Sequence, residues 1–291
     1  MDVTLLFPAG PPRSEERLES ALRAARAADA SLNILRPRPI SPRRPDDCLD
    51  YLAGDDQARS QEILNFLRSE SEKIGWFGRG GFGVTRILSQ LGKDLPSGQP
   101  VGKKLWMGYS DISAMFGFVK TQKLPIDCVH GPMLCAFREQ PNPAQVLDAL
   151  RGIAHPIPLL SPPRELSFSG TIWGGNLAVL ASLCGTDWLP TPSAEETIFL
   201  EDVEEAPYRV DRYLTQLEAS GFFSKTQRVF LGTFTGFEPA EAVSRAAELR
   251  CRQLGLHVLG TLPVGHSEPH SPLFLDHPYR YCRETNSLLP Q

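Results

Sequence analysis

The stretch LWMGYSDI at residues 105–112 decides how the N-terminal half of this chain is expected to fold. Its apolar run, Leu105–Met107, predicts a buried strand that stops at Gly108, and a helix-like pattern follows Ser110. A strand that turns sharply into a helix lifts the turn's side chain out of the sheet and leaves free backbone N–H groups at the helix start. Exposure and nearby donors for an oxyanion are two requirements of a serine nucleophile. Ser110 is therefore a candidate nucleophile, although a Gly-x-Ser motif is common and a turn or helix-cap serine is the competing interpretation.

The regions around this stretch alternate between strand-like and helix-like patterns. Helices are expected to begin at Ser14, near Asp55, after Gly83, after Ser110 and at Asn142. The expected strands are Val3–Phe7, Leu32–Leu35, Lys73–Phe77, Leu105–Met107 and Ile126–Val129. This alternation predicts an α/β fold with a mostly parallel N-terminal sheet flanked by helices on both faces. Functional loops of such sheets lie beyond the carboxyl ends of the strands, where both the Ser110 turn and the glycine-rich residues 78–83 fall.

A proline-rich segment, residues 155–165, separates two regions of different pattern and is interpreted as a linker. We therefore expect an N-terminal domain at residues 1–154 and a smaller C-terminal α/β domain with barrel-like character at residues 166–291. In the C-terminal region, strands are expected near 166–172, 197–201, 228–234 and 257–263, with helices at 176–184, 207–220 and 239–253. Residues 36–48, rich in proline and arginine, are interpreted as a loop.

Composition excludes several functional classes. The 291 residues are 41% hydrophobic and 22% charged, with a net charge of -4, as in a soluble globular protein without a nucleic-acid groove or a polybasic membrane surface. No apolar run is long enough for a membrane span or a signal peptide. The six cysteines are scattered without a C-x-x-C pair, which argues against disulfides or a zinc site and favours the cytoplasm. No cluster of residues argues for a metal or an organic cofactor.

The glycine-rich loop at residues 78–83 has two interpretations. Gly78, Gly80 and Gly83 fit G-x-G-x-x-G, yet no acidic residue follows at the distance that dinucleotide binding needs, and there is no Walker Lys-Ser. Alternatively, the loop is a nest of backbone N–H groups that faces Ser110 and completes an oxyanion hole.

Two partners for Ser110 come from strand ends further along the chain. The apolar run 197–200 ends in Glu201 and Asp202, and residues 259–264 lead into Gly265 and His266. The order serine, acid, histidine is one of the known triad orders. Order alone is a weak signal, because the acids are equally expected to cap the next helix and a lone histidine is more often structural.

Many ordered motifs resemble the LD-carboxypeptidase family of serine peptidases, which includes murein tetrapeptide carboxypeptidases and microcin C immunity peptidases. The resemblance covers most of the chain and is much stronger than any single motif. The matching segments are PAGP (8–11), YLAG (51–54), RGGFG (79–83) with Arg86, GYSDIS (108–113), HGPM (130–133), WGGNL (173–177), LED (200–202), PYRVDR (207–212), LGTFTG (231–236) and GH (265–266).

The resemblance implies a specific chemistry. Ser110 corresponds to the nucleophile, Glu201 to the orienting acid and His266 to the base, with the backbone N–H groups of Gly81 and Asp111 as oxyanion donors. It further implies an N-terminal α/β domain, a barrel-like C-terminal domain, a triad drawn from both, and a homodimer. The implied substrate is a peptide with a terminal D-residue after an L-centre, usually the murein tetrapeptide that loses D-Ala.

Departures from the family pattern affect the substrate more than the triad. Phe82 replaces a frequent tyrosine, His270 replaces a frequent asparagine, and residues 273–276 replace a frequent Pro-Ile-Gly. Arg79 and Arg209 are candidates for binding the substrate carboxylate, with surface ion pairs as the equal alternative. Trp173 is expected either to line the substrate groove or to pack in the core, and His270 and His277 are expected to be solvent-facing loop residues.

Two other functions compete with this hypothesis. A peptidase of the immunity type would remove an amino acid from a peptidyl- or aminoacyl-nucleotide. A non-catalytic protein of the same fold would hold a small carboxylate, although intact Ser110, Glu201 and His266 motifs count against it.

Overall fold

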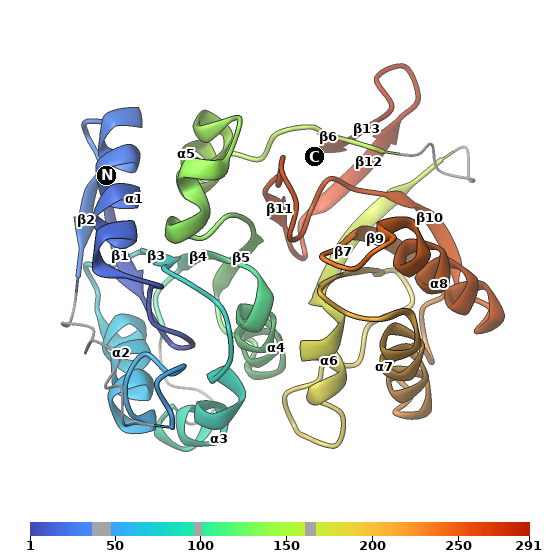
Figure 1. Cartoon of the computed structure of the whole chain (residues 1–291), viewed down its shortest axis with the longest axis horizontal. Coiled ribbons are helices and arrows are strands. Elements are labelled where there is room, and N and C mark those ends of the chain that lie inside the picture. Colours follow the sequence, from blue (N-terminus) through green and yellow to red (C-terminus); the bar gives the residue numbers. More distant parts are fainter. Residues whose placement is uncertain (37–47, 96–100, 161–166) are drawn as a thin grey trace. The chain divides into compact units, whose positions relative to one another are not determined.

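The computed structural model describes residues 1–36, 48–95, 101–160 and 167–291, and these form two compact units, Met1–Ile153 and Ala154–Gln291 (Figure 1). Each unit has its own sheet and its own helices. Within the expected linker, Ile157–Pro158 forms the short strand β6 and pairs with the second unit's β13 (Ser287–Pro290). The rest of that linker from residue 161 onward, and most of the expected loop at 36–48, lie outside the described residues.

The first unit contains the parallel sheet that the alternating pattern predicts. Its strands follow the order β5-β4-β3-β1-β2, and each neighbouring pair in this order is parallel. Because both faces are covered, the strands are almost continuously apolar. The strands are β1 (Asp2–Leu6), β2 (Asn33–Leu35), β3 (Ile74–Phe77), β4 (Lys104–Gly108) and β5 (Ile126–His130).

Helices cover both faces of this sheet, with α1 and α5 on one side and α2, α3 and α4 on the other (Figure 1). Two helix starts are capped by the expected residues: Ser14 accepts a hydrogen bond from Arg17 N at 3.2 Å, and Asp55 accepts one from Ala58 N at 2.6 Å. The helices are α1 (Glu15–Ala28), α2 (Asp56–Arg68), α3 (Val84–Asp94), α4 (Ser113–Gln122) and α5 (Pro143–Leu150), with 3-10 turns η1 (Ser110–Ile112) and η2 (Leu134–Glu139).

The second unit is built on a mixed, curled sheet with the half-barrel character expected from its sequence. Its strand order is β10-β9-β8-β7-β12-β13-β6, with a parallel half, β7 to β10, and an antiparallel half. The expected strands are β7 (Ser169–Asn176), β8 (Thr197–Val203), β9 (Arg228–Thr235) and β10 (His257–Thr261). The sequence patterns did not predict β6, β11 (Leu273–Phe274), β12 (Pro278–Cys282) or β13.

Helices α6 (Leu177–Ser182), α7 (Pro207–Ala219) and α8 (Ala240–Gln253) contact the parallel half of this sheet or one another (Figure 1). Pro207 lies in the first turn of α7 as predicted, whereas Pro239 is the N-cap of α8, one residue earlier than predicted. Gly221, with φ +80°, follows the end of α7 as expected.

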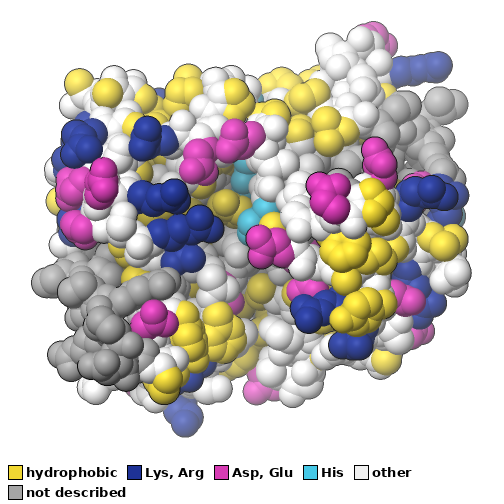
Figure 2. All heavy atoms as spheres, in the orientation of Figure 1, with side chains coloured by type: hydrophobic (Ala, Val, Ile, Leu, Met, Phe, Trp, Pro, Cys, Tyr) yellow, Lys and Arg dark blue, Asp and Glu magenta, His cyan; other side chains and the backbone are white. Residues whose placement is uncertain are grey.

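The surface carries no dominant charge sign on the face drawn in Figure 2, where acidic and basic side chains are interspersed with hydrophobic and uncharged ones. Within the part of the chain that the structure describes, no helix has the length and apolarity needed to cross a membrane.

Candidate active site

Ser110 occupies a strained turn directly after β4. Its φ of +65° lies in the left-handed region, which residues other than glycine rarely adopt. Gly108 keeps the turn tight, since a Cβ there would lie 2.8 Å from Cδ2 of Phe77 and 3.2 Å from Cγ1 of Ile112. η1 and α4 begin directly at this turn. The chain therefore makes the sharp strand-to-helix turn that the sequence predicts.

The glycine loop after β3 lies against Ser110. A Cβ placed on Gly80 would be 2.8 Å from Cβ and 2.9 Å from Oγ of Ser110. Gly10 N donates a hydrogen bond to Gly80 O at 3.0 Å, which fixes the loop against the turn after β1. Gly81 follows with φ +109°. The absence of a side chain at Gly80 is thus what gives the serine hydroxyl its space.

Asp111 has a structural side chain as well as a backbone N–H at the start of η1. Its buried carboxylate accepts a hydrogen bond from Val84 N at 2.9 Å and so caps the first turn of α3. Burial raises the pKa of Asp111 to about 6, although the Val84 N–H and the charge of Arg59 oppose this shift. The side chain of Asp111 thereby ties the end of the glycine loop to the Ser110 turn.

Arg59 on α2 is a residue that sequence reasoning missed. Its guanidinium is fully buried and donates hydrogen bonds to the carbonyl oxygens of Gly83 at 2.8 Å, Gly54 at 3.3 Å and Pro8. It also forms an ion pair with Asp56. Three loops around the serine are therefore held by one cation. The one available signal was that Arg59 lies four residues before Ile63, on the helix face that periodicity predicts to be buried.

The second unit brings Glu201 and His266 together. Glu201 Oε2 lies 2.7 Å from His266 Nδ1, and the Glu201 side chain is fully buried while that of His266 is 17% exposed. Two glycines make room for this pair. A Cβ on Gly265 would lie 2.8 Å from Glu201 Oε2, and one on Gly232 would lie 2.8 Å from Glu201 Cβ. Two of the three residues assigned to the triad are thus in hydrogen-bond contact.

The backbone around His266 is held by two threonines of β9, which lie at a bulge between β8 and β9. Leu200 pairs with Leu231 and Asp202 with Phe234, so β9 carries an extra residue opposite Glu201. Thr233 N donates to Val264 O at 3.0 Å, and Thr235 Oγ1 donates to His266 O at 2.9 Å. The pattern of apolar residues predicted these strands but not the bulge.

The charge around His266 favours its protonated form. Burial by itself lowers the pKa of His266, but the carboxylates of Glu201, Asp202 and Glu204 outweigh it and raise the pKa above its ordinary value. An imidazole that gains stability on protonation is a stronger base, which is the property needed to accept a proton from a hydroxyl.

Several other candidates have structural partners. Arg79 donates to Pro11 O at 2.7 Å, and Arg209 forms an exposed ion pair with Glu205 at 3.3 Å. Trp173 is buried, with its ring 6.3 Å from that of Phe222, so its role is core packing. His270 is buried rather than solvent-facing, which corrects the expectation. The His277 ring lies edge-on to that of Tyr279, with ring centroids 5.6 Å apart.

The structure thus groups the predicted site residues in two sets, Ser110 with Gly81 and Asp111 in the first unit, and Glu201 with His266 in the second. Among the described residues, no cluster of three or more His, Cys, Asp or Glu side chains could hold a metal ion. A serine in a left-handed turn beyond a parallel strand and a buried carboxylate–histidine contact are the components of a serine-type hydrolase.

Comparisons with known proteins narrow this class. The model of the LD-carboxypeptidase N-terminal domain matches residues 3–131, and that of the LD-carboxypeptidase C-terminal domain matches residues 169–280. The chain belongs to the LD-carboxypeptidase family. A relative from Streptomyces coelicolor, which carries a provisional carboxypeptidase name, is 32% identical over 91% of this chain and 85% of its own. The murein tetrapeptide carboxypeptidase of Pseudomonas aeruginosa is 30% identical over 74% of each chain.

Solved structures share the fold across nearly the whole chain. The crystal structure of muramoyltetrapeptide carboxypeptidase from Oxalobacter formigenes has a TM-score of 0.77 at 23% identity and covers 99% of this chain and 97% of its own. MccF in complex with glutamyl sulfamoyl guanosine has a TM-score of 0.72 at 15% identity, with 99% and 94% covered. The solved structures show the fold, while family membership and the sequence relatives from Streptomyces coelicolor and Pseudomonas aeruginosa support a carboxypeptidase function, and so a hydrolase.

Proposed function

We propose that this protein is a serine carboxypeptidase that hydrolyses an L,D-peptide bond and releases the terminal D-Ala of murein tetrapeptide during peptidoglycan recycling. The observation that carries the proposal is the 2.7 Å contact between His266 Nδ1 and the buried carboxylate of Glu201. Support also comes from the family and from a relative named murein tetrapeptide carboxypeptidase.

In the proposed reaction, His266 is the general base and Glu201 orients it. A carboxylate on Nδ1 keeps the proton on that nitrogen, so the lone pair of the neutral ring lies on Nε2. His266 Nε2 takes the proton of Ser110 Oγ as the oxygen attacks the scissile carbonyl, and then gives that proton to the leaving amine of D-Ala. Glu201 stabilises the imidazolium that forms between these two transfers. The reaction requires the Ser110 hydroxyl to reach Nε2 in the working enzyme.

The reaction forms an acyl-enzyme on Ser110, and backbone N–H groups stabilise the negative charge that develops on the substrate's carbonyl oxygen. We assign this role to the N–H groups of Gly81, which follows Gly80 in the glycine loop, and of Asp111, which follows Ser110 in η1. Donors of this kind act without reorganising, because both segments are fixed by hydrogen bonds to the backbone of Gly80 and to the carboxylate of Asp111. Water then releases the L-peptide, with His266 acting once more as base.

The experiment compares the Ser110→Ala variant with wild type and with Ser182→Ala, which removes an exposed hydroxyl on α6. D-Ala release from murein tetrapeptide, followed by mass spectrometry, is expected in wild type and Ser182→Ala and absent in Ser110→Ala. Trapping the serine with a fluorophosphonate should add mass to the peptide containing Ser110. Undiminished turnover by Ser110→Ala would show that another group is the nucleophile.

The same assay with other substrates separates the competing functions. A glutamyl or aspartyl sulfamoyl nucleoside is the matched probe for the immunity-type activity, since MccF structures contain such compounds. Cleavage of this probe without release of D-Ala would contradict the muropeptide assignment. Binding of the peptide by wild type with no cleavage of either substrate would favour the non-catalytic alternative.

We also propose that the protein acts in the cytoplasm, as its scattered cysteines indicate, and that it is a homodimer, as the family resemblance implies. Cell fractionation with an antibody against the chain tests the first statement, and light scattering after size-exclusion chromatography tests the second. Recovery in a membrane pellet or a monomer mass at micromolar concentration would contradict them.

A further inference from the structure

We propose that Asp202 and Asn176 form a positioning pair that holds the end of β8 so that Glu201 meets His266. This inference rests on the proposed function, in which Glu201 orients His266 as the general base. It assigns a task to Asp202, which the sequence patterns could interpret only as a second acid at a strand end.

Asp202 is buried and fully committed as a hydrogen-bond acceptor. The residue is 2% exposed, and its carboxylate accepts from Asn176 Nδ2 at 2.8 Å, from Ala178 N at 2.9 Å and from Val203 N at 2.9 Å. All three partners are donors. An ionised carboxylate satisfies them with its two oxygens, whereas an amide at position 202 would set an NH₂ group against at least one N–H.

Asn176 connects this carboxylate to the neighbouring strand. It ends β7, pairs in register with Glu201 of β8, and accepts from Val179 N at 3.0 Å as the N-cap of α6. Asp202 bonds to Ala178 in the first turn of the same helix. The end of β8 is therefore tied both to β7 and to the start of α6.

This attachment determines which way Glu201 points. Successive side chains on a strand face opposite sides of the sheet. With Asp202 held against the start of α6, Glu201 is directed to the opposite side, where Gly232 and Gly265 leave room for its carboxylate and where His266 lies. A rotation of the strand end that released Asp202 would turn Glu201 away from the imidazole.

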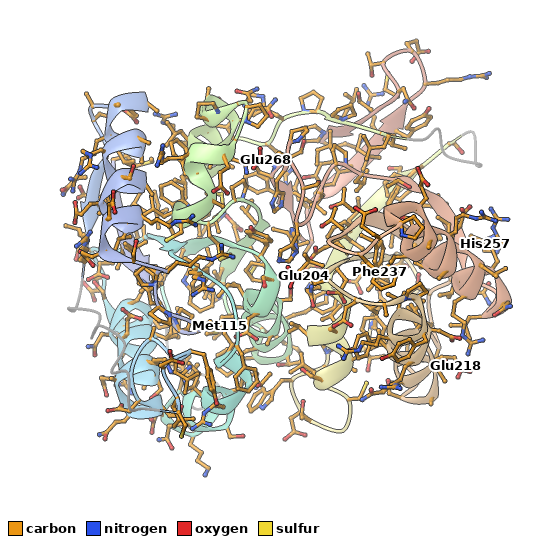
Figure 3. The ribbon with its side chains drawn as sticks, in the orientation of Figure 1. Met115, Glu204, Glu218, Phe237, His257 and Glu268 are labelled. Carbon is orange, nitrogen blue, oxygen red and sulfur yellow. The ribbon has the colours of Figure 1, made fainter. Side chains whose placement is uncertain are left out.

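Three acidic groups raise the pKa of His266, and they differ in position. Glu201 contacts the His266 ring, and Asp202 is the next residue of β8. Glu204 (labelled in Figure 3) follows the end of β8, with φ +58°. Burial, and after it the charge of Glu201, raises the pKa of Asp202 to about 7, while its N–H donors oppose the shift. Glu204, whose charge has the smallest of these effects on His266, provides a control carboxylate outside the paired contact between β7 and β8.

The test exchanges the two members of the pair. Asp202→Asn and Asn176→Asp each break the donor–acceptor match, and each is expected to lower kcat tenfold or more with a smaller change in KM, because neither side chain is assigned a substrate contact. In the double variant, Asn176→Asp with Asp202→Asn, the amide now on β8 can donate to the carboxylate now on β7, which restores the contact between the strands. We expect the exchange to recover part of the kcat lost in the single variants, because the strand contact returns while the amide at position 202 still meets one backbone N–H.

A titration of His266 by NMR provides a readout that does not depend on turnover. In Asp202→Asn the His266 pKa is expected to fall and its ring signals to broaden or shift, in Glu201→Gln to fall further, and in Glu204→Gln to stay near the wild-type value. The exchange variant should move the ring signals back toward those of wild type.

Failure of this inference is distinguishable from failure of the proposed function. If the exchange variant stays as inactive as the single variants while its His266 titration also stays altered, Asp202 and Asn176 are not a positioning pair. The same conclusion follows if the kcat losses match the unfolded fraction measured by urea denaturation. Full activity of Ser110→Ala would instead overturn the proposed function and leave the NMR comparison intact.

Discussion

Replacing Gly80 by alanine tests the close approach between the glycine loop and Ser110. A Cβ at this position would lie 2.8 Å from Ser110 Cβ and 2.9 Å from its Oγ. Carbon atoms in contact prefer about 3.5–4.0 Å, so the loop and the serine must separate by roughly 0.7 Å or more. Misplacement of a reacting atom by about 1 Å can cost ~10²-fold in rate. We therefore expect kcat/KM for D-Ala release to fall about a hundredfold, with a loss of about 1–3 kcal/mol in the free energy of unfolding from overpacking.

Gly102→Ala is the matched control, because a Cβ there would meet only the flexible Lys73 Nζ at 3.4 Å. Both variants restrict the unfolded chain in the same way, so their difference isolates the contact with Ser110. Steady-state kinetics on murein tetrapeptide and urea denaturation measure the two effects. If Gly80→Ala keeps kcat/KM within threefold of the control at equal stability, the loop does not constrain the nucleophile and the argument is refuted.

Three further predictions concern charge. Burial raises the pKa of the Asp111 carboxyl from 3.8 to about 6, so the folded state binds the carboxyl proton more tightly than the unfolded chain does. The free energy of unfolding should therefore fall as pH rises from about 4 to about 6 and then level off. Asp111→Asn should remove up to roughly 3 kcal/mol of that fall, seen in urea denaturation at several pH values, and an unchanged slope would contradict the assignment. Arg59→Met should lower the free energy of unfolding by about 3 kcal/mol, because it leaves Asp56 and three carbonyl groups without their buried cation. Arg86→Met, on the exposed side of Asp56, should change this free energy little, and equal losses in the two variants would count against the role of Arg59. The pKa of His266 is raised and the base must be neutral, so the acidic limb of the pH profile of kcat/KM should lie above pH 6.5. This limb should move to lower pH in Glu201→Gln, and a limb that stays in place would exclude His266 as the base.

The fold of the first unit could be predicted almost completely from local patterns. Its strands are mostly apolar runs, and its helices begin at capping residues such as Ser14 and Asp55. The antiparallel edge of the second unit could not be predicted. β12 and β13 are short and mix polar with apolar residues, and β6 contains a proline, so neither periodicity nor propensity distinguishes them from loops.

The candidate site could be predicted only in part. Glu201, Asp202 and His266 fall at strand ends, but the pattern could not tell which acid faces the histidine, because that depends on the contacts of Asp202 with Asn176 and with the start of α6. Asp202 does cap a helix, as the competing interpretation expected, although the helix is α6 and not the one that follows it in the chain. The contacts of Arg59 with three loops and of Asn176 with Asp202 join distant parts of the sequence, so local patterns do not predict these partners.

The left-handed turn at Ser110 has a consequence for how this chain can evolve. At φ +65° a side chain of any kind carries a backbone penalty of about 1–2 kcal/mol that glycine escapes. Ser110→Gly should therefore yield a more stable protein that lacks the proposed nucleophile, while Ser110→Ala keeps the strain. Selection for stability favours glycine at position 110, whereas selection for hydrolysis favours serine. In a gene copy that is no longer selected for activity, glycine at position 110 should be fixed early, which would mark descendants that have lost hydrolysis while keeping the fold.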